Sequence, residues 1–206
     1  MNIQWLGHSS FRLEESTSTT VVTDPYPDIG IRMPKVRADA IAISESKYSN
    51  IQAVSGNPVI FNKPGIYDFK GVAITAISPN DDGEKLIFKF RMDGIDICHL
   101  GGINQSVTSE LIDILVPVNV LLIPVGGNMT IGAEEAKEYV DALMPEIVIP
   151  MHYRVKNLSL DIDKLDGFVR LFEPEAVECL EEHALEVGRK DIDSMSTKVV
   201  IFKKFE

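Results

Sequence analysis

Short apolar runs dominate the first hundred residues and predict a series of β-strands. The runs cover 3–6, 10–14, 20–23, 40–43, 59–61, 65–69 and 72–77. Two further alternating runs, 86–91 and 95–100, flank Met92-Asp93-Gly94. Asp-Gly between alternating apolar runs is the strongest short-range signal for a β-hairpin. The first half of the chain therefore predicts a strand meander that opens a sheet.

The second half alternates between helical and extended patterns. Its predicted elements are a helix at 108–116, a strand at 120–123, a helix at 133–143, a strand at 147–149, a helix at 165–172 and closing strands near Leu185 and at 198–202. The helix at 133–143 is the best defined, because Ala136, Tyr139, Val140 and Leu143 form one apolar stripe. This alternation is typical of parallel α/β units.

Composition narrows the class of protein. A chain of 206 residues suits a single domain, 1–206, and its net charge of -11 disfavours binding to nucleic acid. The longest apolar run, 114–125, is too short to span a membrane. Cys98 and Cys179 lack metal-type or redox spacing, so both are expected to be reduced core residues. We therefore expect a soluble cytoplasmic protein with no nucleic-acid or membrane partner.

Candidate chemistry begins where the strand at 40–43 runs into the polar segment 44–50. Small apolar and β-branched residues at 40–43 indicate a strand that is covered on both faces. Ligands of α/β proteins bind at the carboxyl ends of such strands. The segment 44–50 is therefore the first place where a site is expected.

Several strings along the chain resemble, in order, those of the metallo-β-lactamase superfamily, in a branch resembling ascorbate-6-phosphate lactonase. The strings are Trp5-Leu-Gly-His-Ser9, Thr23-Asp-Pro25, Pro64-Gly-Ile-Tyr-Asp-Phe69, Cys98-His-Leu-Gly-Gly102, Leu121-Leu-Ile-Pro-Val-Gly-Gly127 and Ile147-Val-Ile-Pro-Met-His-Tyr153. The resemblance implies an α/β fold, a four-layer αβ/βα sandwich. Two mixed sheets would lie face to face, with helices outside and a pocket at one edge.

The resemblance also implies which residues stand at the metal-ligand positions. Where the family carries His-x-His-x-Asp-His, this chain reads Glu45-Ser-Lys-Tyr-Ser-Asn50. Six of the seven ligand positions are thereby changed: Glu45, Lys47, Ser49, Asn50, Asn80 and Gly102. His152 is the one retained ligand position. His8 and Asp24 would lie close to the pocket without being main ligands, Asp81 follows Asn80, and His99 would support the site.

Two interpretations follow. We favour a non-catalytic relative that keeps the fold for binding a small molecule or for assembly. No cofactor is expected in it, because a zinc site needs three or four ligands. The alternative is a residual hydrolase of a small phosphorylated or lactone-like substrate. In it, His152, Glu45, Asp24 or Asp81 would hold one zinc or manganese ion, or His152 and His99 would act as acid and base.

Three smaller expectations accompany these interpretations. The ammonium of Lys47 would occupy the position of the first metal, paired with Glu45 or Asp24. His183, among acidic residues, would be a solvated surface residue. The protein would form a homo-oligomer, since relatives in this branch often self-associate.

Overall fold

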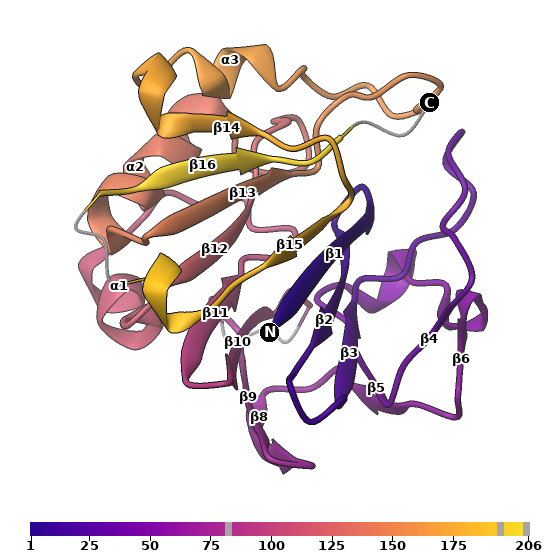
Figure 1. Ribbon diagram of the computed structural model, residues 1–206. Helices are drawn as coiled ribbons and strands as arrows, with labels where there is room; N and C mark the ends of the chain where they lie inside the picture. Colours follow the sequence, from indigo (N-terminus) through magenta and orange to yellow (C-terminus); the bar gives the residue numbers. More distant parts are fainter. Residues whose placement is uncertain (81–83, 193–195, 204–206) are drawn as a thin grey trace.

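The computed structural model describes residues 1–80, 84–192 and 196–203, and its main feature is a pair of β-sheets that face each other (Figure 1). The six-stranded sheet has the order β15-β1-β2-β3-β5-β7. Its strands are β1 (Asn2–Gly7), β2 (Ser10–Glu14), β3 (Thr20–Thr23), β5 (Ala40–Ala42), β7 (Val59–Phe61) and β15 (Ala184–Glu186). The first three pair in antiparallel fashion, while β3, β5 and β7 run parallel. The sheet is therefore mixed.

The eight-stranded sheet has the order β14-β16-β13-β12-β11-β10-β9-β8. Its strands are β8 (Gly65–Phe69), β9 (Val72–Ile77), β10 (Ile87–Met92), β11 (Ile95–His99), β12 (Val120–Pro124), β13 (Ile147–Met151), β14 (Val177–Cys179) and β16 (Lys198–Ile201). Strands β8 to β11 form an antiparallel meander, and β11, β12, β13, β16 and β14 run parallel. The predicted α/β fold with two mixed sheets is confirmed.

Helices cover the outer face of the larger sheet (Figure 1). They are α1 (Ser109–Leu115), α2 (Ala133–Leu143) and the short α3 (Asp166–Val169). On the smaller sheet, the described residues provide 3-10 turns and a two-stranded ribbon: η1 (Ser46–Tyr48), η2 (Ile51–Ala53), β4 (Val36–Arg37) and β6 (Val54–Ser55). Two more 3-10 turns, η3 (Pro174–Ala176) and η4 (Arg189–Asp191), lie in the C-terminal part.

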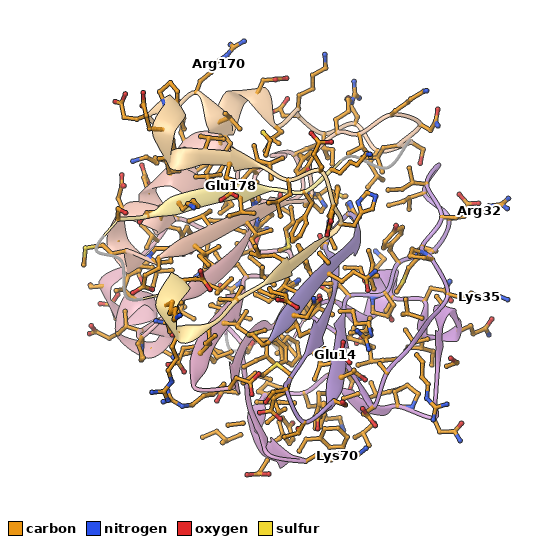
Figure 2. The ribbon with its side chains drawn as sticks, viewed as in Figure 1. Glu14, Arg32, Lys35, Lys70, Arg170 and Glu178 are labelled. Atoms are coloured by element: carbon orange, nitrogen blue, oxygen red, sulfur yellow. The ribbon has the colours of Figure 1, made fainter. Side chains whose placement is uncertain are left out.

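Strand alternation divides the buried side chains between two cores. Ala40 and Ala42 of β5 face the main core between the sheets, and Ile41 and Ile43 face the smaller core beneath the β4–β6 ribbon. Burial on both faces explains why 40–43 contains no charged residue. Charged side chains such as Arg32, Lys35 and Arg170 project outward instead (Figure 2).

Most predicted elements are confirmed within two residues, and three predictions need correction. The helix expected at 165–172 ends at Val169, because the amides of Leu171 and Phe172 bond to carbonyls three residues back. Cys179 is exposed on the edge strand β14 and is not a core residue, whereas Cys98 is buried. His183 is half-buried and its Nδ1 is buried, so the prediction of a solvated surface residue is wrong.

The carboxyl ends of the parallel strands meet at one edge of the sandwich. Strands β1, β3 and β5 end there at His8, Asp24 and Ser44, and β13 ends there at His152. This is the edge at which a sheet of this kind binds ligands. Within the described residues, none of the helices has the length and apolar composition needed to cross a membrane.

Candidate functional site

A cavity of about 390 Å³ opens at this edge between the two sheets. Its ionisable lining residues are His8, Asp24, Glu45, Lys85 and His152. Its apolar wall consists of Pro25, Tyr26, Ile29, Met129 and Leu160. Small-molecule sites fall between about 300 and 1,000 Å³ and combine an apolar wall with a few polar groups. The cavity has the size and lining of a ligand site.

Three of the lining residues leave their strands in the left-handed backbone region. The φ angles are 50° at His8, 37° at Asp24 and 53° at His152. Non-glycine residues rarely adopt this region, although Asp and His tolerate it better than most. Strained backbone of this kind concentrates at ligand sites, where the surrounding structure holds it in place.

Asp24 is fixed by the polar group that follows β5. Its Oδ1 accepts the backbone N–H of Ser44 at 2.6 Å, and its Oδ2 accepts the Ser44 hydroxyl at 2.6 Å. His99 lies 3.8 Å from Oδ2, measured from its Nε2. The carboxylate of Asp24 is therefore positioned by protein donors at the back of the cavity.

His99 is fully buried behind the cavity and uses both ring nitrogens within the protein. The backbone N–H of Gly101 donates to Nδ1 at 3.1 Å, which makes Nδ1 an acceptor. Nε2 therefore carries the proton and donates to the carbonyl of Ser9 at 2.9 Å. His99 orients the chain around the site and does not line the cavity, so it is unavailable as the acid or base partner of His152.

His8 and His152 form a ring pair on the cavity wall, with centroids 4.4 Å apart. Burial lowers the pKa of His8 to about 3, with a further contribution from the neighbouring His152. Burial likewise lowers the pKa of His152 to about 4. Both imidazoles are therefore neutral at pH 7, which suits hydrogen bonding to a ligand better than charge pairing.

Glu45 and Lys85 place opposite charges beside Gly102. A Cβ built on Gly102 would lie 3.3 Å from Glu45 Oε2 and 4.0 Å from Lys85 Nζ. Lys85 Nζ donates to the carbonyl of Gly102 at 2.7 Å. Burial is the largest influence on the Glu45 carboxyl and raises its pKa, while the nearby Lys85 acts in the opposite direction. A side chain at position 102 would point between these two charged groups.

The structure brings together some of the residues predicted from sequence. His8, Asp24, Glu45, Ser49, Gly102 and His152 line the cavity. Lys47 is exposed and outside the cavity lining, so the cation expected there is supplied by Lys85 instead. Asn80 is exposed, Asn50 lines a separate shallow groove, and Asp81 lies outside the described residues.

Among the polar lining residues, Lys85, Tyr26 and Thr130 were not predicted from the sequence, and neither were the apolar lining residues Ile29, Met129 and Leu160. Lys85 reaches the cavity because the backbone N–H of Leu86 bonds to the carbonyl of Ser44 at 2.8 Å, joining the two sheets at this edge. Tyr26 donates its hydroxyl to the carbonyl of Leu6 at 2.9 Å and presents its ring edge to His8. Proximity to the Thr23-Asp-Pro25 string was the one signal that could have indicated Tyr26.

Among the described residues, no group of three or more His, Cys, Asp or Glu side chains is arranged to hold a metal ion. His8 and His152 are adjacent, but both carboxylate oxygens of Asp24 accept hydrogen bonds from Ser44, and Glu45 is close to the positive charge of Lys85. Zinc sites in proteins use three or four such ligands. The residues present do not fit a zinc centre.

A family model described as "Beta-lactamase superfamily domain" matches residues 2–152, which is most of the chain. The matched part includes the strand ends at His8, Asp24, Ser44 and His152. The chain belongs to the metallo-β-lactamase superfamily. Within it, the chain is similar to proteins named UPF0173 metal-dependent hydrolase. One from Methanoculleus marisnigri is 30% identical over 186 residues, covering 74% of this chain and 81% of the relative.

Two further relatives agree with this assignment. A UPF0173 metal-dependent hydrolase from Thermococcus onnurineus is 27% identical over 191 residues, covering 74% of this chain and 84% of the relative. A crystal structure from Thermotoga maritima, of a candidate zinc-dependent hydrolase of the superfamily, superposes with a TM-score of 0.85 at 35% identity. It covers 98% of this chain and 97% of that protein. The metallo-β-lactamase fold therefore extends over 98% of this chain.

Proposed function

We propose that this chain is a metal-independent member of the superfamily that binds a small molecule in the cavity and does not carry out metal-dependent hydrolysis. The proposal is supported by the side chains at the positions where the family resemblance places metal ligands. Glu45, Lys47, Ser49, Asn50, Asn80 and Gly102 replace six of seven ligands. A single retained imidazole, His152, cannot anchor a dication on its own.

The observation that carries the proposal is the ammonium of Lys85. In the family, an aspartate at position 102 would bridge two metals. Zn–O bonds to carboxylates are about 2.0–2.2 Å, which puts a bound ion a few ångströms beyond the aspartate Cβ. Lys85 Nζ lies 4.0 Å from the Cβ position of residue 102, within the reach of such an ion. The protein thus supplies a cation of its own close to the position where an aspartate of the family would bind metal.

Charge balance in the cavity supports the same conclusion. The carboxylate of Asp24 is satisfied by two Ser44 donors, and Glu45 and Lys85 oppose each other. The two imidazoles are neutral because burial holds their pKa values well below 7. An added dication would meet Lys85 at close range and repel it, so metal binding would have to displace that side chain.

The test is metal content. The protein is expressed with added zinc or manganese, purified without chelator and measured by inductively coupled plasma mass spectrometry. We expect less than about 0.1 metal ion per chain, because a zinc site needs three or four ligands and the described residues include no such cluster. The matched control restores the six family ligands in one variant, with folding checked by circular dichroism; it should retain metal.

Stoichiometric metal in the unmodified chain would contradict the proposal. Together with turnover of a phosphorylated sugar lactone, that result would establish the residual hydrolase instead. A crystal structure with anomalous data at the zinc edge would then identify the ligands around His152.

A further inference from the structure

The cavity presents one negative and one positive side chain, Glu45 and Lys85, close to Gly102. Glu45 Oε2 lies 3.3 Å and Lys85 Nζ 4.0 Å from the position that a Cβ of Gly102 would occupy. Because residue 102 is glycine, no side chain fills the space beside these two groups. Glu45, Lys85 and Gly102 all line the cavity, so a ligand bound beside Gly102 can contact both charged groups.

Each of the two charged groups retains binding capacity. An ammonium has three N–H donors, and the described contact of Lys85 with Gly102 O uses one of them. The carboxylate of Glu45 is half-buried and lines the cavity. A cationic group of a ligand would offset the cost of burying this charge, and an anionic group would accept from the remaining donors of Lys85. The ligand should therefore carry both charges close together.

The rest of the cavity sets the remaining chemistry of the ligand. Met129, Leu160 and Ile29 provide an apolar part of the cavity wall. His8 and His152 line the cavity as a ring pair and add ring nitrogens that can hydrogen-bond to a ligand. About 390 Å³ accommodates a small metabolite but no folded partner.

We propose that the cavity binds a zwitterionic α-amino acid with an apolar side chain. Its ammonium pairs with Glu45, its carboxylate pairs with Lys85 beside Gly102, and its side chain packs against Met129 and Leu160. The proposal rests on the metal-independent function above, because a metal at this position would displace Lys85 and remove the cationic half of the site.

The test uses isothermal titration calorimetry of the purified full chain at pH 7 with L-leucine, N-acetyl-L-leucine and L-leucinamide. The acetyl group removes the cation and the amide removes the anion, while the side chain stays the same. A hydrogen bond to a charged group contributes enough that each blocked compound should bind at least about tenfold more weakly than leucine.

Variants assign each charge to its partner. Lys85→Met should weaken leucine at least about tenfold and leave leucinamide nearly unchanged, because leucinamide has no carboxylate to lose. Glu45→Gln should weaken leucine and leave N-acetyl-leucine nearly unchanged. Lys47→Met is the matched control, since Lys47 is a neighbouring lysine outside the cavity lining, and it should leave leucine binding within about twofold.

Equal binding of leucine and its two blocked forms, or no binding of leucine, would overturn this ligand assignment. So would equal effects of Lys85→Met and Lys47→Met in folded proteins. These failures are separate from failure of the proposed function. A chain that contains no metal and does not bind leucine contradicts only the ligand assignment. A chain that contains stoichiometric zinc contradicts the metal-independent function, whether or not leucine binds.

Discussion

The residues that shape the cavity are held in strained backbone by bonds from their neighbours. A left-handed conformation costs a non-glycine residue about 1–2 kcal/mol. At His8, this cost is offset because its carbonyl accepts the indole N–H of Trp5 at 3.1 Å and the amide of His152 at 3.3 Å. At Asp24, the two bonds from Ser44 have the same role. The site is thus preorganised by its own hydrogen bonds.

The buried histidine pair predicts a loss of stability in mild acid. The folded-state pKa values of about 3 for His8 and about 4 for His152 lie below the ordinary 6.5. The unfolded chain therefore binds more protons below pH 6.5, and stability falls as the pH is lowered from there to about 4 for the His152 contribution and to about 3 for that of His8. At pH 5 the loss should be on the order of 2 kcal/mol per histidine relative to pH 7.5, measured by urea unfolding.

The control for this prediction is the double variant His8→Gln, His152→Gln. Its stability should change much less between pH 7.5 and 5. The carboxylates with lowered pKa values, such as Asp39 and Asp93, act only at lower pH, and Glu45 acts in the opposite direction because its pKa is raised. A parallel decline in both proteins would assign the acid sensitivity to groups other than the histidines.

Gly101 cannot be replaced without moving the wall of the site. Its φ is +57°, and an added Cβ would lie 2.5 Å from Ser44 Cβ and 2.7 Å from Leu86 O. Gly71 is a matched control, since its φ is +88° and an added Cβ meets nothing within 4 Å. Both alanine variants incur backbone strain, but overpacking should make Gly101→Ala about 1–3 kcal/mol less stable than Gly71→Ala in urea unfolding. Equal losses of unfolding free energy in the two variants would mean that Ser44 and Leu86 shift to accommodate the added Cβ at little cost.

At the level of elements, helix α1 depends on a side-chain cap. The Thr108 hydroxyl accepts the backbone N–H of Leu111 at 3.2 Å, just before the first residue of the helix. Removing such a cap typically costs about 1 kcal/mol. Thr108→Ala should therefore lower the melting temperature by about 2–4 °C, measured by circular dichroism. Ser106→Ala, in the exposed preceding loop, should change it by less than about 1 °C.

Element positions could be predicted where one side of the element is buried. Helix α2 shows its full length, Ala133–Leu143, in its apolar stripe, and the Asp93-Gly94 hairpin shows in its turn residues. Strand β14 was missed because it lies at a sheet edge with no buried residue, so its sequence shows no alternation. The terminal part of the 165–172 segment was mistaken for α-helix because tighter turns share much of its spacing.

At the level of the whole molecule, the site could be predicted only in part. Side chains that directly follow strands, such as Asp24, Glu45 and His152, lie where strand order puts them. Lys85 could not be found this way, because its approach to Gly102 depends on how the β10–β11 hairpin docks against β5 of the other sheet. The way in which two sheets dock does not follow from the hydrophobic periodicity of either, so this contact could not be predicted from the sequence pattern.

Stability of the whole fold should be independent of metal. A ligand that binds only the folded state raises stability with the logarithm of its concentration over its dissociation constant. Since the described residues include no cluster fit for a metal, neither EDTA nor excess zinc should shift the melting temperature by more than about 1 °C in differential scanning calorimetry. A zinc-dependent rise that saturates near one or two equivalents would show that a metal site forms.

The pairing of β1 with β15 has a consequence for synthesis on the ribosome. Ala184–Glu186 supplies the edge strand of a sheet whose other members all come from the first 61 residues. A nascent chain that has emerged only as far as β13 lacks β15, so one edge of β1 has unpaired N–H and C=O groups that can pair with a strand of another chain. Completion of this sheet must await the late arrival of residue 186, and chaperone protection of the emerging N-terminal half becomes most valuable in that interval.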